Sequence, residues 1–328
     1  MSVSRLIVLA PALLLLTACA GPLSTFNTAG RGAEAISRIF WWMAAGAGII
    51  WIAVVILALY CARGHRVPEA QRFAPLLIVG GGVVLPSVVL TALLAFGLPS
   101  LQPLIDLDRT SRLSIAVAGE QWWWRVRYIS LSGDTVDLAN EIRLPVGERV
   151  DVQLSSGNVI HSFWIPAIAG KVDMIPGRTT HLSLEPTRTG VFRGTCAEYC
   201  GTSHAMMAFP VAVLAREVFD AWLAEQSKPA QEPVTVQAAR GRDLFAANGC
   251  SACHTIRGTS AAGVIGPDLT HVGSRMSLAA ATLPNETAHM VDWITEPERA
   301  KPGVHMPAFG VLGSDQLHAL AAYLSGLR

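Results

Sequence analysis

Charged residues are scarce in this 328-residue chain: they make up 15% of it, with 25 Lys and Arg against 24 Asp and Glu. The resulting net charge of +1 excludes a strongly basic protein that binds nucleic acid through its overall charge. The hydrophobic fraction, by contrast, is 51%. A chain so poor in charge and so rich in apolar residues is typical of a membrane protein, and its length leaves room for two or three domains.

Charge is absent altogether from two apolar runs, Ile39–Cys61 and Pro75–Leu98, which are 23 and 24 residues long. As helices, with about 1.5 Å per residue, each would reach about 35 Å, enough to cross the hydrocarbon core of a bilayer. Three arginines lie between them in the segment 62–74, and positive charge favours the cytoplasmic side. We therefore predict a transmembrane helix hairpin over residues 39–98, with both ends of the mature chain outside.

The N-terminus has the layout of an export signal. Arg5 precedes the apolar run Leu6–Leu16, and small residues follow as far as Cys19. This pattern predicts a signal peptide over residues 1–18. The residues that end in Cys19 resemble a bacterial lipobox, which implies a lipidated Cys19 that anchors an external segment, residues 19–38. Ordinary cleavage nearby and a retained apolar segment are the alternatives.

Cysteine is also scarce, with six residues, and four of them form two close pairs. The first pair, Cys196 and Cys200, is followed by His204 and Met207, and His161 lies 35 residues upstream of Cys196. Sulfur with imidazole is a copper ligand set, and a weak axial thioether is typical of electron-transfer copper. Two thiols rather than one indicate two copper ions that share bridging thiolates. A disulfide in an exported protein is the alternative, but it leaves the histidines and the methionine unexplained.

The segment Cys196–Met207 resembles the CuA loop of subunit II of heme-copper oxidases, whose pattern is Cys-x-Glu-x-Cys-x-x-x-His-x-x-Met. The resemblance implies a cupredoxin-like β-sandwich over residues 110–226, and short alternating runs such as Val150–Leu154 are typical of its strands. It also implies that the Glu198 carboxylate binds a magnesium ion shared with subunit I. The implied copper ligands are the side chains of His161, Cys196, Cys200, His204 and Met207 and the backbone carbonyl of Glu198.

Three adjacent tryptophans, Trp122–Trp124, cannot all share one face of a strand. They resemble the aromatic segment of the same family, which implies that electrons enter at Trp122. We expect Trp124 to lie in the core, and Trp122 to be exposed or at an interface.

The second pair of cysteines belongs to Cys250-Ser-Ala-Cys253-His254, a c-type heme attachment motif. Two thiols at this spacing add to the heme vinyl groups, and His254 follows at once to reach the iron. A Pro-rich linker, residues 227–234, precedes the motif. We therefore predict an all-α class I cytochrome c domain over residues 235–328.

The second ligand of the heme iron has several candidates. The run Lys301–Pro307 resembles the loop that supplies a methionine in cytochromes fused to oxidase subunit II, which implies Met306. Met276, Met290 and His305 are the alternatives. A His and Met pair suits electron transfer, because it raises the potential and leaves no position for a substrate.

Nearly the whole mature chain resembles subunit II of a caa-type cytochrome c oxidase with a fused cytochrome c domain. This resemblance implies a subunit through which electrons enter a respiratory terminal oxidase. They would pass from an external cytochrome c, or another periplasmic donor, through heme c and the dinuclear CuA centre. The acceptor would be subunit I, with hemes a and CuB, which reduces O2 to water and pumps protons.

The same resemblance implies a subunit III partner and a place in the bacterial inner membrane, with the soluble domains on the periplasmic face. The main alternative is the CuA and heme c subunit of a nitric oxide reductase. A copper-storage or chaperone protein is a third possibility, but it would need neither heme c nor the hairpin.

Overall fold

The computed structural model describes residues 21–63, 70–105, 113–130 and 133–328. The predicted signal peptide and Cys19 lie outside the described residues. The chain divides into two compact units, of which one comprises Glu34–Asp106 and the other the remainder.

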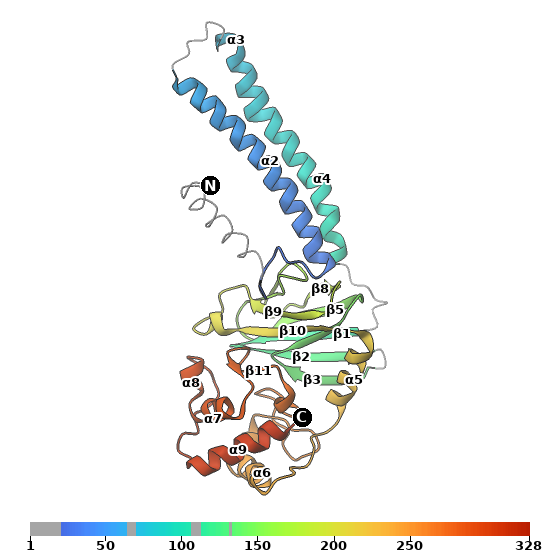
Figure 1. Cartoon of the computed structure of the whole chain (residues 1–328), viewed down its shortest axis with the longest axis vertical. Coiled ribbons are helices and arrows are strands. Elements are labelled where there is room, and N and C mark those ends of the chain that lie inside the picture. The colour runs from blue at the N-terminus through green and yellow to red at the C-terminus, as the bar shows by residue number, and fades with distance from the viewer. Residues whose placement is uncertain (1–20, 64–69, 106–112, 131–132) are drawn as a thin grey trace, which may run out of the picture. The chain divides into compact units, whose positions relative to one another are not determined.

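The first unit contains two long helical stretches (Figure 1). Helix α2 spans Arg31–Ala62; the second stretch runs through α3 (Ala70–Pro75), the wide π-helical turns of η1 (Leu76–Val84) and α4 (Leu85–Ile105). Both contain an apolar window long enough to cross a membrane, and no residue of either window is buried. The structure therefore confirms two candidate membrane-spanning helices. The first begins at Arg31, so that residues 31–38, expected in the external segment, are helical.

The second unit contains a cupredoxin-like β-sandwich. One sheet has the strand order β3-β2-β1-β5-β8 and the other the order β4-β10-β9-β6-β7. Its strands are β1 (Leu113–Glu120), β2 (Trp123–Ser130), β3 (Thr135–Ala139), β4 (Ile142–Pro145), β5 (Val150–Ser156), β6 (His161–Trp164), β7 (Val172–Met174), β8 (Thr180–Leu184), β9 (Gly190–Cys196) and β10 (Ala208–Leu214). Helix α5 (Arg216–Ser227) follows the last strand. The strand predicted at Val150–Leu154 is present as part of β5.

Alternation of apolar and polar residues builds the core between the sheets. Side chains along β1 are alternately buried and half-buried, as expected for a strand with one face on a core. Trp124 is 1% exposed and lies edge-on to Phe163 and Phe209, with ring centroids 5.8 and 5.1 Å away. This aromatic cluster confirms the predicted core position of Trp124.

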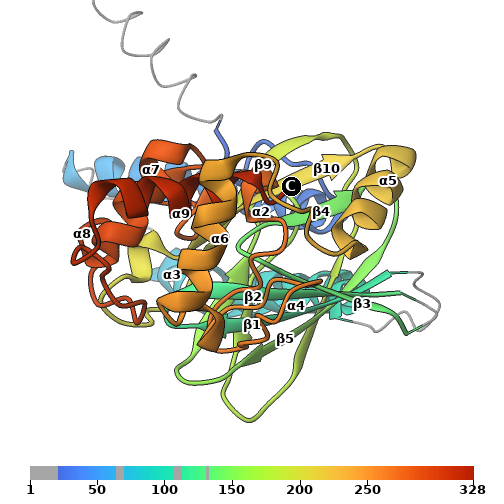
Figure 2. The same ribbon diagram turned by 90° about the horizontal axis from the view of Figure 1, so that it is seen from below.

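A small helical domain follows the sandwich (Figure 1). Its elements are α6 (Val236–Ala247), η3 (Cys250–Ala252), η4 (Val272–Ser274), the two-residue strands β11 (Ser277–Leu278) and β12 (Leu283–Pro284), α7 (Thr287–Thr295), α8 (Pro297–Ala300) and α9 (Ser314–Gly326). Helices α6 and α9 cross at close range (Figure 2). Gly241 permits this approach, because a Cβ atom there would lie 2.0 Å from the carbonyl oxygen of Ala319.

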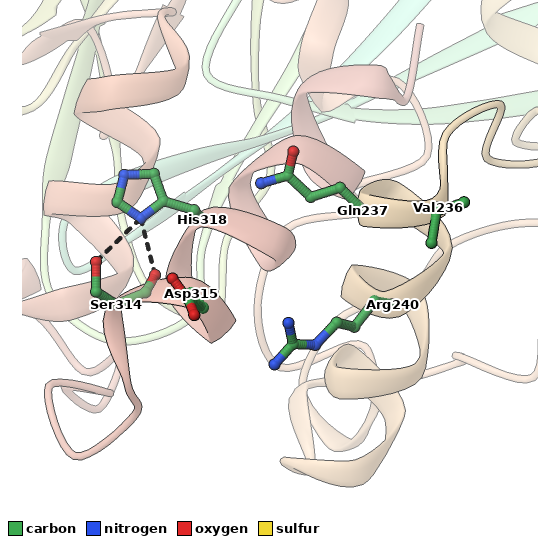
Figure 3. A pocket seen from close by; sticks show the side chains of 6 residues that line it. All are labelled: Val236, Gln237, Arg240, Ser314, Asp315 and His318. Atoms are coloured by element: carbon green, nitrogen blue, oxygen red, sulfur yellow. Dashed lines mark hydrogen bonds between the residues drawn. The ribbon is translucent and has the colours of Figure 1, made fainter.

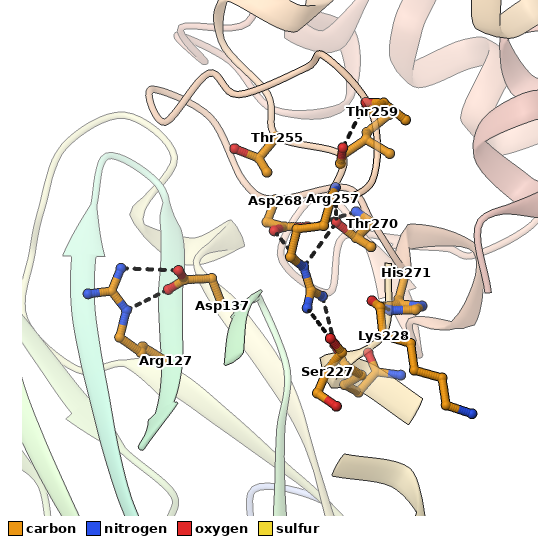
Figure 4. A network of polar contacts seen from close by, with 12 residues as sticks. Arg127, Asp137, Ser227, Lys228, Thr255, Arg257, Thr259, Asp268, Thr270 and His271 are labelled. Carbon is orange, nitrogen blue, oxygen red and sulfur yellow. Dashed lines mark hydrogen bonds and ion pairs between the residues drawn. The ribbon is translucent and has the colours of Figure 1, made fainter. Parts of the chain in front are cut away.

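The segment between the two soluble domains is bonded to the helical domain. Arg257 donates to the carbonyl oxygens of Gln226 and Ser227, at 2.7 and 3.2 Å (Figure 4). The amide of Ala230 donates to the Arg257 carbonyl at 2.8 Å, and His271 Nε2 lies 3.0 Å from the Lys228 carbonyl oxygen. The predicted linker thus follows the surface of the domain that it precedes, and sandwich and helical domain belong to one compact unit.

Candidate metal centres

Strand pairing brings the predicted copper ligands together. Strands β6 and β9 are antiparallel neighbours, with Phe163 opposite Cys196, so His161 lies beside the end of β9. The chain leaves β9 at Cys196 and returns through the turn His204–Met206 to Met207 and β10. His161 fits because residue 119 is glycine: a Cβ atom there would lie 2.7 Å from the imidazole ring.

The ligand atoms form a compact cluster. Cys196 Sγ lies 3.8 Å from Cys200 Sγ and 3.8 Å from His161 Nδ1. Cys200 Sγ lies 3.5 Å from His204 Nδ1 and 3.8 Å from Met207 Sδ. The ligand atoms of His161, Cys196 and Cys200 all lie within 4.8 Å of one another, and all three residues are buried.

The two sulfur atoms are separate thiols, as both cysteines are free. A disulfide requires about 2.05 Å between its sulfurs, so the observed 3.8 Å excludes this alternative. Metal–sulfur bonds of about 2.3 Å, the length found for zinc, would let one ion touch both sulfurs. The Glu198 carbonyl oxygen is 3.2 Å from Cys196 Sγ, and the Glu198 residue is exposed.

The cluster favours deprotonated sulfur and a correctly oriented imidazole. A hydrogen bond from Cys200 lowers the pKa of the Cys196 thiol to about 3, and the adjacent Cys196 raises the pKa of Cys200. His161 Nε2 lies 3.2 Å from Asn158 Oδ1. This amide oxygen accepts the Nε2 proton and leaves Nδ1 free for a metal. The donor set therefore fits copper.

Trp122 is buried, not exposed. It is 6% exposed, and its indole Nε1 donates to the Cys200 carbonyl oxygen at 2.9 Å. The loop after Lys301 covers the ring: the His305 ring centroid is 6.1 Å away, and a Cβ atom at Gly303 would lie 3.1 Å from the indole. Trp122 was expected to be exposed or at an interface, and it is buried at an interface with the helical domain of the same chain.

The histidine of the predicted heme attachment motif, His254, has the tautomer that a ligand of iron needs. His254 Nδ1 lies 2.8 Å from the Pro267 carbonyl oxygen. Because a carbonyl only accepts, Nδ1 carries the proton and Nε2 keeps its lone pair. Burial lowers the pKa of His254, which favours the neutral ring. Cys250 and Cys253 are half-buried free thiols.

The candidates for the second iron ligand differ in their surroundings. Met290 is 2% exposed and part of the hydrophobic core of the helical domain. The backbone amide of Met276 donates to Glu141 of the sandwich at 2.7 Å, and His305 faces Trp122. Met306 is half-buried against the domain core, a position compatible with a ligand from the same loop.

The sequence did not predict that Lys301 lies beside the proposed copper ligands. The residue is 2% exposed, and its Nζ donates to the carbonyl oxygens of Met206 and Ala279 at 3.0 and 3.1 Å. Burial lowers the pKa of Lys301 to about 7, and the charge of Cys200 opposes this shift. No sequence signal marks a buried lysine, since lysine is mostly exposed in folded proteins.

A separate pocket of about 650 Å³ lies between the first turns of α6 and α9 (Figure 3). His318 Nδ1 donates there to the Ser314 carbonyl oxygen at 2.8 Å. No sulfur ligand lines this pocket, so it is neither the copper nor the heme site. The lining residues are Val236, Gln237, Arg240, Ser314, Asp315 and His318.

Comparison with known families identifies both soluble domains. Residues 130–215 match the family described as cytochrome c oxidase subunit II, periplasmic domain, and residues 238–328 match the cytochrome c family. The fold defines a membrane protein that joins a cupredoxin-like domain to a cytochrome c domain.

Relatives that match about two thirds or more of the chain specify the family further. Cytochrome c oxidase subunit 2 of Alkalihalophilus pseudofirmus is 39% identical over 214 residues, which cover 65% of this chain and 61% of the relative. The subunit 2 of Bacillus sp. strain PS3 is 31% identical over 249 residues, covering 73% and 69%. The chain belongs to the cytochrome c oxidase subunit 2 family. It spans less than two thirds of the length of the first of these relatives.

A solved structure is also similar. The crystal structure of the periplasmic domain of subunit II of cytochrome oxidase from Bradyrhizobium japonicum is 29% identical; the match covers 37% of this chain and 97% of that one, with a TM-score of 0.34.

Proposed function

We propose that this chain is the subunit through which electrons enter a respiratory terminal oxidase. It would take electrons from an external cytochrome c or another periplasmic donor, and pass them through heme c and dinuclear copper to the catalytic subunit. That subunit would reduce O2 to water and pump protons. The single observation that carries the proposal is the position of Trp122, which contacts the loop before Met306 on one side and the Cys200 carbonyl on the other.

Six groups would hold the copper ions. Copper bound here would supply one-electron redox chemistry without a substrate site. The two cysteine sulfurs are close enough to bridge, and each histidine Nδ1 lies beside one sulfur, His161 at 3.8 Å from Cys196 and His204 at 3.5 Å from Cys200. Met207 is fully buried, with a thioether suited to a weak axial position. The proposed ligands are His161, Cys196, Cys200, His204, Met207 and the carbonyl of Glu198.

The helical domain would hold heme c through thioether bonds from Cys250 and Cys253. His254 presents a neutral Nε2, because its Nδ1 proton is bonded to Pro267, and Met306 would be the second iron ligand. A Cβ atom at residue 266 would lie 2.5 Å from the His254 ring, so Gly266 leaves the imidazole its position. These residues bind and orient; they leave no position for a substrate on the iron.

Further partners follow from the exposed groups. The Glu198 carboxylate would bind magnesium at a boundary with subunit I, since carboxylate oxygens suit this hard cation. Subunit I, with hemes a and CuB, and subunit III would pack against the apolar faces of α2 and α4, whose membrane windows contain no buried residue. The complex would lie in the bacterial inner membrane, with both soluble domains on the periplasmic face.

Purification of the intact complex tests this function. Its optical spectrum should contain bands of hemes a and c together, and the complex should consume O2 with reduced cytochrome c. A complex that carries heme c without heme a and turns over nitric oxide instead would identify the nitric oxide reductase alternative and refute the oxidase proposal.

A further inference from the structure

We propose that the cytochrome c domain is a structural component of the copper site. Lys301 and the turn Ala279–Thr282 act as positioning residues that hold the segment Met206–Ala208, and with it Met207. This inference rests on the proposed copper site.

The turn has an unusual backbone. Ala279, Ala280 and Ala281 have φ angles of 51°, 57° and 62°, and they connect the paired strands β11 and β12. Left-handed conformations are unfavourable for residues with a Cβ atom, and runs of them are rare. Such a backbone persists where its surroundings over-determine it. Ala280 is 1% exposed, so contacts on the turn define its conformation.

Those contacts are with the segment Met206–Ala208, the copper segment. The Ala208 amide donates to the Ala280 carbonyl oxygen at 3.3 Å. The Met206 carbonyl oxygen accepts from Lys301 Nζ at 3.0 Å and from Thr282 Oγ1 at 3.4 Å. Both peptide groups that flank Met207 are therefore bonded by the cytochrome c domain. The sandwich itself adds the bond from the Cys196 amide to the Met207 carbonyl, at 2.9 Å.

Lys301 joins the two partners directly. Its ammonium group bonds Met206 on the sandwich and Ala279 on the turn, and it is almost completely buried. Among the described residues, no carboxylate lies within ion-pair distance of it. A buried charge requires compensation, which here comes from the carbonyl dipoles of Met206 and Ala279. Lys301 therefore has both of its hydrogen-bond partners only while the sandwich and the helical domain are docked.

Hydrogen bonds to the backbone on either side of a ligand matter most when that ligand is weakly bound, as the Met207 thioether would be. Outer hydrogen bonds orient metal ligands and tune the metal, and an axial thioether adjusts the potential of a copper site more than it retains the ion. Met207 Sδ is 3.8 Å from Cys200 Sγ. Loss of the bonds to Met206 and Ala208 should therefore change the copper electronics while copper stays bound.

The test uses the full-length chain loaded with heme and copper. Lys301→Met removes the ammonium group but keeps an apolar side chain in place. Hydrogen exchange at the Ala208 amide reports the support of the segment directly, and paramagnetic resonance and redox titration report the copper. Lys228→Met is the matched control, since this lysine is exposed and paired with Glu225. Glu141→Leu is a second control. It removes the hydrogen bond from the Met276 amide across the same domain interface, and this bond does not involve the copper segment.

Because a bond from a charged group is lost, Lys301→Met should speed exchange at Ala208 about tenfold or more. It should also alter the copper hyperfine pattern and potential, with the optical spectrum of heme c unchanged. Lys228→Met and Glu141→Leu should leave the copper signals as in the parent.

Unchanged exchange and copper signals in Lys301→Met would overturn the inference. Equal changes in Glu141→Leu would also overturn it, because general separation of the domains would then be the cause. If Lys301→Met does not accumulate, Lys301→Gln should show smaller changes in the same direction, and parental values would again refute the role. A parent chain that binds no copper would instead refute the proposed function.

Discussion

Gly303 is the position where one added methyl group tests the contact between the two redox domains. Its φ is +77°, and a Cβ atom would lie 3.1 Å from Cη2 and 3.3 Å from Cζ3 of Trp122. The indole has little freedom to move, because it is buried and its Nε1 is bonded to the Cys200 carbonyl. Gly303→Ala should therefore displace the loop that precedes Met306.

The magnitude follows from two additive effects. A left-handed backbone at a non-glycine residue costs about 1–2 kcal/mol, and the steric contact with Trp122 adds to this cost. A loss of one or two kcal/mol lowers the population of the docked loop, relative to the undocked loop, by a factor of about 5–30. If electron transfer between heme c and copper requires the docked loop, its rate should fall by the same factor.

Gly147→Ala is a matched control. Gly147 has a φ of +76°, and a Cβ atom there meets nothing within 4 Å, so this variant shares the backbone strain without the contact. Both variants should unfold more easily, but only Gly303→Ala should slow transfer in a pre-steady-state measurement that starts from reduced heme c. Parental transfer rates in Gly303→Ala would show that the contact with Trp122 is not used.

Three further substitutions separate the roles of the remaining residues. Trp122→Phe should slow transfer from heme c with little loss of copper, since the Cys200 carbonyl keeps its bond from Gln121 at 2.9 Å; equal rates in stopped-flow experiments would refute this role. Met207→Leu should retain copper but shift its potential and spectrum, and the parental spectrum and potential would exclude Met207 as a ligand. Met306→His should keep heme covalently attached while lowering its potential; redox titration checks this, and an unchanged potential would point to Met276 or Met290.

The cluster of proposed copper ligands was predictable because most of these residues share one short loop. The loop between β9 and β10 contains or adjoins Cys196, Cys200, His204 and Met207. Pairing of β6 with β9 places His161 beside this loop. Ligand type and local spacing are properties of the sequence. The strands were predictable for a similar reason, since the alternation along β1 reports which face is buried.

Contacts between distant segments could not be predicted in this way. Trp122 is buried because Gly303 and His305 cover it, and nothing in the aromatic segment itself indicates that cover. Ala279–Ala281 have a left-handed backbone that alanine rarely adopts, so composition predicted neither the turn nor its bond to Ala208. The Pro-rich linker was predicted from composition, whereas its bonds to Arg257 depend on how the helical domain folds.

The start of the first long helix shows another limit. Charge and apolar length defined the membrane span, but the helix begins earlier, at Arg31. Ala29 and Gly30, just before it, are fixed by contacts with Ala167 and Pro186 of the sandwich. Tertiary contacts therefore determine where the helix begins, while the sequence pattern determines which part of it is apolar enough to span a membrane.

The central claim is that two thiolates, 3.8 Å apart, bridge two copper ions. Electron paramagnetic resonance of the copper-loaded full-length chain tests this most directly. A dinuclear centre with one electron shared over both ions should give a multiline copper pattern, and Cys200→Ser should abolish it. A spectrum of mononuclear blue copper from fully loaded protein would contradict the account.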